Sequence, residues 1–419
     1  MQVIDKDLGS FKVHLIKTDL FKTITMKVMF HTPIIKEDIT KRNILSDILL
    51  TSSRKYATRR DLNIKSEELY AADIYTSNQR IGNYITTSFI LQTLNDKYTE
   101  DGNFASSVEF LHEIIFNPDL IDNKFKDEKL ELVKSNAKIA LESIKENSEN
   151  YSIIRLKEEY DNKSSVSYRM TGYLDDLEKI NTQNLYDYYE KMIENDYVDI
   201  FVIGNINIKE LLLIIKKYFK FRKVKKRKKS YELDYHLPRK KVKTIKEVTS
   251  NNQAKLAIAL SISKLKDFDK KYSLLILNII LGGTADSKLF KEVREKNSLC
   301  YTIRSSYSRL DNLMIISAGI DNINYDKVLD LINKIFDDIK KGKFNESDIS
   351  VAKEYYNTLT ESIVESPARL INESFSEKIL GVDSLEKRKE NINKITKKDI
   401  IRVSKKLNID TIFLLEGGD

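Results

Sequence analysis

Residues 108–143 read VEFLHEIIFNPDLIDNKFKDEKLELVKSNAKIALES, and residues 328–362 repeat the pattern as VLDLINKIFDDIKKGKFNESDISVAKEYYNTLTES. Phe116 of the first copy aligns with Phe336 of the second. In both copies the apolar residues recur at helical i, i+3 and i+4 spacing, which predicts a pair of amphipathic helices. Because each helix pair must lay its apolar face on other structure, the repeat predicts two similar folded units.

A second repeat closes each predicted unit. Residues 179–205, KINTQNLYDYYEKMIENDYVDIFVIGN, parallel residues 394–418, KITKKDIIRVSKKLNIDTIFLLEGG. Each copy reads as a capped helix, then an apolar strand, then glycine. Thr182 and Thr396 are the predicted N-caps, because a threonine hydroxyl can accept a hydrogen bond from an N–H group of the first helical turn.

The predicted fold class is α+β, with two tandem homologous domains that each form a mainly antiparallel sheet with helices packed on one face. Hairpin-like strands mixed with helices, rather than strict strand-helix alternation, favour this arrangement. We place the N-terminal domain at residues 1–220, the C-terminal domain at residues 247–419 and a basic linker at residues 221–246. The expected strands are residues 11–15, 23–31, 84–92, 198–203, 255–263, 301–307, 313–320 and 411–415.

Composition narrows the class of protein. A chain of 419 residues exceeds what one hydrophobic core usually organises, and 41% hydrophobic with 32% charged residues is typical of a globular protein. No apolar run is long enough to span a membrane, and the N-terminal ten residues do not form a signal peptide, so a cytoplasmic protein is expected. The single cysteine, Cys300, agrees with a reducing compartment. Much of the +8 charge lies in the predicted linker without a nucleic-acid motif, so no nucleic-acid partner is expected.

Residues 281–306, LGGTADSKLFKEVREKNSLCYTIRSS, predict a glycine pair at a helix end, a short helix and a strand. This run resembles the signature of the C-terminal half of insulinase-like (pitrilysin family) metallopeptidases, in which LGG…S-x-LF precedes R-E-K-x-x-L-x-Y. The resemblance implies that Arg294 and Tyr301 reach the substrate carbonyl oxygen and stabilise the oxyanion of the tetrahedral intermediate. Two structural alternatives remain open. Arg294 could pair with Glu292 or Glu295, and Tyr301 could be a half-buried strand residue.

The zinc motif of this family is missing. Its active members carry H-x-x-E-H on a helix, because residues four apart share a helical face and hold one metal while the Glu activates water. The chain has four His, and no two of them are four apart. By resemblance, the motif would fall at Asn43, Ser46 and Asp47, and the third ligand, a Glu, would fall near Lys134. A cation at that position would repel zinc.

The resemblance spans essentially the full length and points to a bacterial branch of the family that lacks the zinc motif. That branch is linked to modification of elongation factor P with a 5-aminopentanol group. Families of this type often work as unequal pairs, in which one subunit holds zinc and the other presents the Arg and Tyr. The resemblance therefore implies a noncatalytic subunit of a hydrolase heterodimer, with no cofactor of its own, a zinc-bearing homologous partner, and a peptide or unfolded protein as substrate.

Two other functions remain open. In one, the chain is itself a metallopeptidase with an unorthodox ligand set such as His31, Asp47 and Asp73. In the other, it is a scaffold or peptide-binding module in which Arg294 and Tyr301 are relics. Metal analysis would test the first, and a neighbouring gene for an H-x-x-E-H homologue would argue against the second. The sequence also leaves open the substrate, and whether the isolated chain is a monomer or a homodimer.

Overall fold

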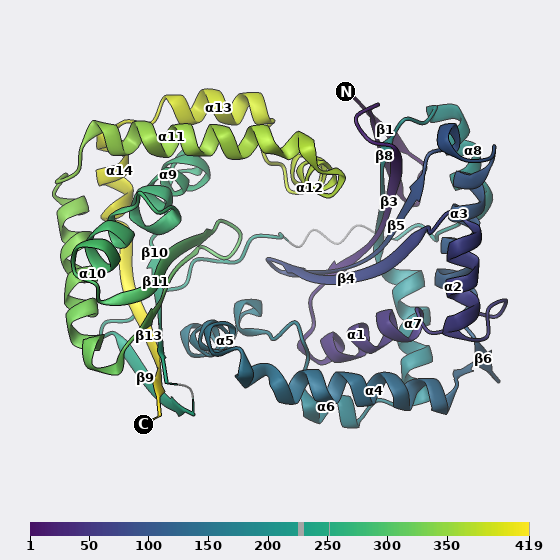
Figure 1. Cartoon of the computed structure of the whole chain (residues 1–419), viewed down its shortest axis with the longest axis horizontal. Helices are drawn as coiled ribbons and strands as arrows, with labels where there is room; N and C mark the ends of the chain where they lie inside the picture. The colour runs from purple at the N-terminus through teal and green to yellow at the C-terminus, as the bar shows by residue number, and fades with distance from the viewer. Residues whose placement is uncertain (225–229, 251, 419) are drawn as a thin grey trace. The chain divides into compact units, whose positions relative to one another are not determined.

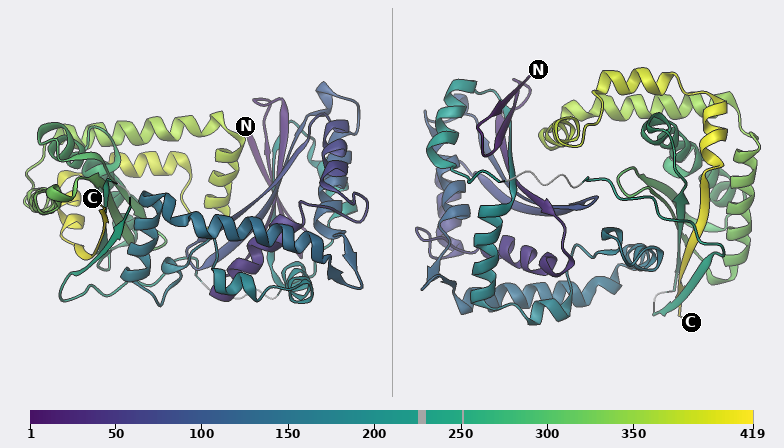
Figure 2. Two further views of the ribbon diagram at one scale, coloured as in Figure 1. Left: turned by 60° about the horizontal axis from the view of Figure 1, so that its bottom comes forward. Right: turned by 180° about the vertical axis from the view of Figure 1, so that it is seen from behind.

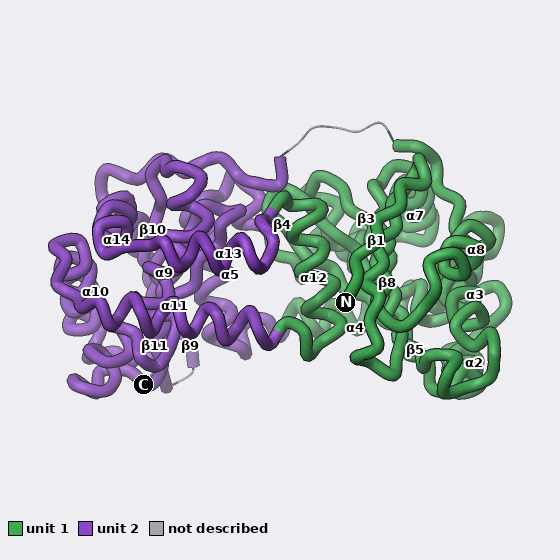
Figure 3. The backbone as a smooth tube through the Cα atoms, turned by 90° about the horizontal axis from the view of Figure 1, so that it is seen from above, with its two compact units in different colours: residues 1–142, 169–229, 363–381 green, residues 143–168, 230–362, 382–419 purple. Residues whose placement is uncertain are grey.

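The computed structural model describes residues 1–224, 230–250 and 252–418, which divide into two compact units. Figure 3 shows unit 1 in green, with residues 1–142, 169–229 and 363–381, and unit 2 in purple, with residues 143–168, 230–362 and 382–419. Each unit contains one large sheet and several helices, which confirms the α+β class with two similar domains. Each unit also includes a segment from the other half of the sequence. The linear division at residues 220 and 247 stays a prediction.

Unit 1 is built on a six-stranded sheet with the order β1-β2-β8-β3-β5-β4. All neighbouring strands run antiparallel except β2 and β8. The central strands β3 and β5 are long and mostly buried, whereas β1 and β4 form the edges and are more polar. The strands are β1 (Gln2–Asp7), β2 (Lys12–Lys17), β3 (Thr23–Pro33), β4 (Asp73–Ile81), β5 (Tyr84–Leu94) and β8 (Tyr197–Gly204), with a small hairpin of β6 (Leu120–Ile121) and β7 (Lys124–Phe125).

The helices of unit 1 include both members of the first repeated pair, α3 and α4. Helix α3 packs on β5 and against α8, and helix α1 packs against α4 and α7. The helices are α1 (Ile39–Ile48), α2 (Arg59–Glu68), α3 (Asn103–Phe116), α4 (Asp127–Glu142), α6 (Leu174–Glu178), α7 (Thr182–Asn195), α8 (Ile208–Tyr218) and α12 (Pro367–Lys378).

Unit 2 is built on a five-stranded sheet with the order β11-β12-β10-β13-β9. Only the pair β13 and β9 is parallel, so the prediction of a mainly antiparallel sheet is confirmed. The strands are β9 (Lys243–Thr249), β10 (Ala254–Ile262), β11 (Cys300–Ser308), β12 (Leu313–Ile320) and β13 (Leu407–Gly417).

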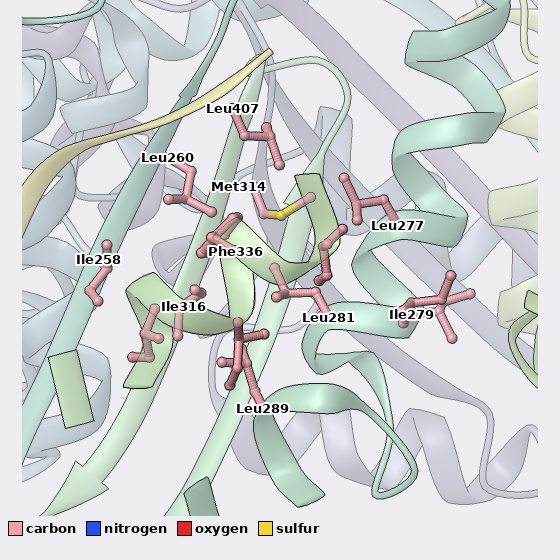
Figure 4. Close-up of a cluster of buried hydrophobic side chains, with 14 of the residues drawn as sticks. Ile258, Leu260, Leu277, Ile279, Leu281, Leu289, Met314, Ile316, Phe336 and Leu407 are labelled. Carbon is pink, nitrogen blue, oxygen red and sulfur yellow. The ribbon is translucent and has the colours of Figure 1, made fainter. Parts of the chain in front are cut away.

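The helices of unit 2 enclose its largest apolar core, part of which is shown in Figure 4. Helix α10 buries Val328, Ile332, Phe336 and Ile339 along one face, as the repeat predicts. Burying a side chain of this size contributes about 1.5–3 kcal/mol, so such a stripe fixes the helix on the sheet. The helices are α5 (Ser148–Tyr160), α9 (Leu274–Asn278), α10 (Tyr325–Lys340), α11 (Glu346–Glu361), α13 (Leu385–Asn393) and α14 (Lys397–Ser404), with a π-helical segment at Phe290–Lys296.

One further helix covers the opposite face of each sheet, and it comes from the other half of the sequence. In unit 1, helix α12 packs on β2 and β8. In unit 2, helix α5 packs on β10 and β13. Figures 1 and 2 allow both helices to be followed, α12 in yellow-green and α5 in blue. Among the described residues, no helix combines the length and apolar character needed to cross a bilayer.

The two predicted helix caps have different outcomes. Thr396 caps α14, and its side chain forms a capping box with Asp399. The prediction for Thr182 is wrong by one residue, because Asn181 is the N-cap of α7 and exchanges hydrogen bonds with Asn184. An asparagine side chain caps a helix as well as a threonine does, so both positions were compatible with the sequence.

The predicted linker, residues 221–246, is only partly a connection between units. Its residues 225–229 lie outside the described residues. Leu233 is buried in unit 2, where its backbone N–H donates to the carbonyl oxygen of Leu310 and its carbonyl oxygen accepts from Nδ2 of Asn312. Residues 243–246 begin strand β9, which pairs with β13. Part of the basic segment therefore belongs to the sheet of unit 2.

Candidate functional site

Helix α1 carries Asn43, Ser46 and Asp47, where the resemblance places the H-x-x-E-H motif, and the buried Arg42 holds this helix on unit 1. The Arg42 guanidinium donates to the carbonyl oxygen of Phe30 at 3.2 Å and forms an ion pair with Asp196. It also donates to the hydroxyls of Thr87 and Tyr188. Asp196 and Tyr188 raise the pKa of Arg42, so the cation stays charged although it is buried. This anchor fixes the orientation of the helix.

Two of the three side chains at these helix positions form hydrogen bonds within the protein. Asn43 donates from Nδ2 to the carbonyl oxygen of Met170 at 2.7 Å. Ser46 accepts from Nδ2 of Asn78 at 2.7 Å. Asp47 is exposed, and partial desolvation raises the pKa of its carboxyl above the ordinary value of 3.8. No imidazole is present here, and a single carboxylate beside an amide and a hydroxyl does not form a zinc site.

The position of the third ligand also does not fit zinc. Lys134 lies on α4, which packs against α1. Its ammonium group donates to the carbonyl oxygen of Ile180 at 3.0 Å and lies 3.8 Å from Glu131. Lys134 therefore stabilises a loop, and its charge opposes a bound cation. Residues Asn43, Ser46, Asp47 and Lys134 are thus unsuited to a family-type zinc site.

The unorthodox ligand set is not supported by the structure. His31 is buried and bonds through Nε2 to Asp199 at 2.7 Å, while Asp47 and Asp73 are exposed. Within the residues that the structure describes, no group of three His, Cys, Asp or Glu side chains is arranged to hold a metal ion. The alternative in which His31, Asp47 and Asp73 bind a metal is therefore not favoured.

In unit 2, the glycine pair of the 281–306 motif brings a helix end close to strand β11. A Cβ atom on Gly282 would lie 2.6 Å from the backbone nitrogen of Ser305 and 2.9 Å from Leu289. Only glycine allows this approach. The hydroxyl of Ser305 donates to the carbonyl oxygen of Asn278 at 3.1 Å and joins the same two elements. Figure 4 shows Leu281 and Leu289 in the adjoining core.

Arg294 lies on the exposed face of the helix that follows this junction. Its guanidinium carbon lies 4.7 Å from the centroid of the Phe290 ring. Glu292 does not pair with it, because Glu292 binds Lys296 at 2.6 Å. Among the residues that the structure describes, no carboxylate lies within ion-pair distance of Arg294. The predicted alternative of an arginine paired with Glu292 or Glu295 is therefore not what the structure contains.

Tyr301 lies at the start of β11, in a β-bulge. Cys300 pairs with Ile320 and Thr302 pairs with Gly319, so Tyr301 is the extra residue of the strand. Bulges re-aim side chains and often occur beside functional sites. The Tyr301 side chain is 57% exposed, and its hydroxyl makes a long hydrogen bond of 3.4 Å to Asp321. The half-buried alternative for Tyr301 is therefore not observed.

Arg294 and Tyr301 lie on adjoining elements. The connecting residues 297–299 close by backbone hydrogen bonds from Ser298 to Arg294 and from Leu299 to Val293. Burial raises the pKa of the neighbouring Cys300 thiol to about 11, and the Arg294 charge partly opposes this rise. The thiol is thus protonated at neutral pH, whereas the nearby cation and phenol are exposed and can donate hydrogen bonds.

Three contributors to the site were not identified from sequence. Asn78 bonds to Ser46, and Asp321 to the Tyr301 hydroxyl, but both are distant from these partners in sequence. Phe290 was visible in principle, because it precedes Arg294 by four positions, and such residues are neighbours on a helix. The positions corresponding to the zinc site belong to unit 1, whereas the arginine and tyrosine belong to unit 2.

Residues 179–356 match the family described as the Peptidase M16 inactive domain. This range includes the glycine pair, Arg294 and Tyr301. The family is that of the insulinase-like peptidases, to which the 281–306 motif pointed.

Individual relatives agree with this match. The chain is 27% identical over 416 residues to "Probable inactive metalloprotease YmfF" of Bacillus subtilis, covering 98% of this chain and 97% of that protein. A crystal structure of a conserved protein from Enterococcus faecalis is 30% identical, with a TM-score of 0.91 and 99% of both chains covered. The peptidase M16 inactive domain from Pseudomonas fluorescens is 16% identical with a TM-score of 0.81, covering 100% of this chain and 98% of that one. This last likeness shows the fold alone.

Proposed function

Because the chain is an insulinase-like (M16) metallopeptidase homologue that lacks the zinc motif, we propose that it is the noncatalytic subunit of a zinc peptidase pair. In this pair it binds peptide and presents Arg294 and Tyr301 to the scissile carbonyl. A zinc-bearing homologous subunit supplies the metal and the activated water. By resemblance, this subunit is the bacterial peptidase known as YfmH. The chain itself holds no cofactor and cleaves nothing alone.

The exposed state of Arg294 is the observation that carries this proposal. Other cations on the same helix are paired, Lys296 with Glu292 and Lys291 with Asp286. Arg294 has no carboxylate partner among the described residues, although acidic side chains lie close in sequence. An arginine that served only helix stability would gain from such a pair. An arginine that meets a developing oxyanion must keep its N–H donors free.

The chemistry required of the two residues is electrostatic. Attack of water on a peptide carbonyl moves negative charge onto the oxygen, and donors fixed before the reaction stabilise that charge. A guanidinium remains protonated throughout, and a phenol adds one hydroxyl donor. Both groups strengthen their interaction only as charge develops, so they raise the rate without holding the metal.

Peptide binding is supported by the edges of the two sheets. Strand β4 pairs only with β5, and strand β11 pairs only with β12, among the described residues. An extended peptide can add to such an edge through backbone hydrogen bonds. The bulge at Tyr301 lies on β11, so one of these edges carries a proposed donor.

The cellular part of the proposal rests on resemblance alone. We place the pair in the cytoplasm of a bacterium and associate it with the modification of elongation factor P. The expected result is a change in the intact mass of elongation factor P when the gene for this chain is deleted and its partner is kept. An unchanged mass would remove this association and leave the peptidase pair untouched.

The test of the pair uses the purified complex of this chain with its zinc-bearing partner and a quenched fluorescent peptide of unstructured sequence. Arg294→Ala should leave folding and pairing intact and lower turnover by about 10²–10³-fold, because one oxyanion donor is lost. Tyr301→Phe should lower turnover less. Lys296→Ala is the matched control, since Lys296 lies on the same helix but is paired with Glu292.

Two outcomes would contradict the proposal. Normal turnover in both Arg294→Ala and Tyr301→Phe would favour the scaffold, with the two residues as relics. Roughly one zinc per isolated chain by elemental analysis, together with chelator-sensitive hydrolysis by that chain alone, would favour the metallopeptidase alternative.

A further inference from the structure

We propose that Phe290 is a positioning residue, whose ring holds the Arg294 guanidinium while leaving its N–H donors free for the substrate. This inference rests on the proposed function of Arg294. Phe290 and Arg294 are four positions apart on one helix, and the guanidinium carbon lies 4.7 Å from the ring centroid. That distance is within the range at which an aromatic face attracts a cation.

The choice of an aromatic holder has a chemical consequence. A carboxylate would orient an arginine by accepting its N–H groups, and would also neutralise its charge. A ring attracts the cation through its π-face and accepts none of the in-plane hydrogen bonds. The five N–H groups therefore stay available to a carbonyl oxygen. Among the described residues, the acidic neighbours Glu292 and Asp286 bind lysines, so they do not compete.

The local backbone also favours a positioning role. Phe290 and Arg294 lie within the π-helical segment Phe290–Lys296, and such wide turns recur at functional sites. Phe290 is half-buried, so its ring is held by the protein and offers a fixed surface. Arg294 is exposed. A long, exposed side chain loses rotational freedom when it binds substrate, and a ring that already restricts it reduces that loss.

The test compares three variants of Phe290 in the complex with the zinc-bearing partner, using the same fluorescent peptide. Phe290→Leu keeps an apolar side chain but removes the ring, and kcat should fall about two- to fivefold with KM little changed. Phe290→Tyr keeps the ring and should behave like the natural chain. Phe290→Met is a second ringless variant for the case in which leucine impairs folding. Tyr218→Leu is the control, because Lys217 lies 4.7 Å from that ring in the other unit.

A double-mutant cycle separates positioning from a structural role. In the Arg294→Ala background, Phe290→Leu should cause no further loss, because the residue through which it acts is gone. A further loss there, or a fall in thermal midpoint that accounts for the lost activity, would overturn the inference. Equal turnover in the leucine, methionine and tyrosine variants of Phe290, with Arg294→Ala still impaired, would also overturn the inference. That result would leave the proposed function of Arg294 intact. Normal turnover in Arg294→Ala would instead reject the proposed function itself.

Discussion

The second faces of the two sheets are covered in chemically different ways. In unit 2, helix α5 covers the sheet with an apolar contact, in which Leu156 packs with Ala257, Ala259 and Phe413. The small alanines leave room for the helix, and the aromatic ring fills the space between. Helix α5 also forms polar contacts with β9, namely the bond from Tyr151 to Glu247 and the ion pair of Arg155 with Glu247.

In unit 1, helix α12 covers the sheet with a mixed contact. Phe375 and Leu370 pack on apolar strand residues, but a chain of charged groups runs beside them. Asp199 bonds to His31 at 2.7 Å and to His14 at 3.1 Å. His14 then bonds to Asp5 at 2.8 Å, and Asp5 binds Lys378 at the end of α12 at 2.7 Å.

This difference shows that one position in a repeated fold can be filled by two kinds of interaction. The apolar contact gains stability from area removed from water and is insensitive to pH. The charged side chains in unit 1 lose hydration energy when they are buried. Their mutual attraction compensates for this loss only while every partner is present. Unit 1 should therefore be sensitive to single polar substitutions and to pH, and unit 2 to the removal of apolar volume.

The largest expected effect on stability follows from removing the charge of Asp199, which lies at the centre of the charged side chains beside α12 in unit 1. Asp199→Asn leaves His14 and His31 without their common carboxylate, and His14 is only 3% exposed. Breaking a buried pair by removing one partner typically costs about 3–5 kcal/mol. Urea unfolding followed by circular dichroism would measure the loss. Asp267→Asn, at an exposed ion pair with Lys271, is the control, and an equal effect in both variants would contradict the comparison.

A smaller but substantial effect is expected from opening the apolar contact in unit 2. Leu156→Ala removes a fully buried side chain and should cost about 2–5 kcal/mol, with the value set by how far the site collapses. The loss should be the same at pH 6 and pH 8, because the buried cluster that Leu156 joins is made of apolar and aromatic side chains. Leu370→Ala in α12 is the matched variant in unit 1. A strongly pH-dependent loss of stability for Leu156→Ala would contradict the proposed difference between the two units.

The smallest expected effect is the pH dependence of unit 1 contributed by His14. Although burial opposes the charge, hydrogen bonds to Asp199 and Asp5 raise the pKa of His14 above its ordinary value of 6.5. A raised pKa gives stability that is fully present below pH 6.5 and is lost as pH rises through the folded value. The free energy of unfolding should thus fall as the pH rises above about 6.5. His14→Gln should remove this slope.

Low pH should also lower the stability of unit 1, because the carboxylates of Asp199 and Asp5 become protonated. The histidines keep the pKa of Asp199 well below its ordinary value, and Lys378 and His14 lower the pKa of Asp5. Their contribution is present above the ordinary carboxyl pKa and is lost as pH falls through the folded values. His112, whose pKa is lowered by burial, opposes stability when it is protonated. A pH profile of His14→Gln that matches the natural chain would assign the slope to other groups.

Periodicity and motif spacing predicted much of this fold. The helix pair α10 and α11 follows the repeat, and strands β10, β12 and β13 are continuous apolar runs that read as buried strands. Strands β4 and β9 were missed because they are edge strands with polar sequences, and β9 lies in a basic region that reads as a linker. Edge strands often carry polar and charged residues, so composition alone does not separate them from loops.

The candidate site was only partly predictable. The motif located Arg294 and Tyr301 by their spacing, but the bulge at Tyr301 depends on the pairing between β11 and β12. The sequence did not predict that α5 and α12 each cover the sheet of the other half of the sequence. An amphipathic helix does not specify which sheet it covers. The buried contact of His14 with Asp199 joins strands that are far apart in sequence. In the sequence, each of these residues is a single polar residue in an apolar strand, so nothing indicates that they pair.

The placement of α12 also affects how the chain is made. Residues 367–378 leave the ribosome long after strands β2, β3 and β8, whose apolar residues Ile16, Met29 and Phe201 they cover. At ordinary rates of synthesis the delay is on the order of ten seconds. During that time the nascent N-terminal sheet presents an uncovered apolar surface, and Asp5 still lacks its partner Lys378. We therefore expect the N-terminal half to benefit from a ribosome-associated chaperone until helix α12 has been made.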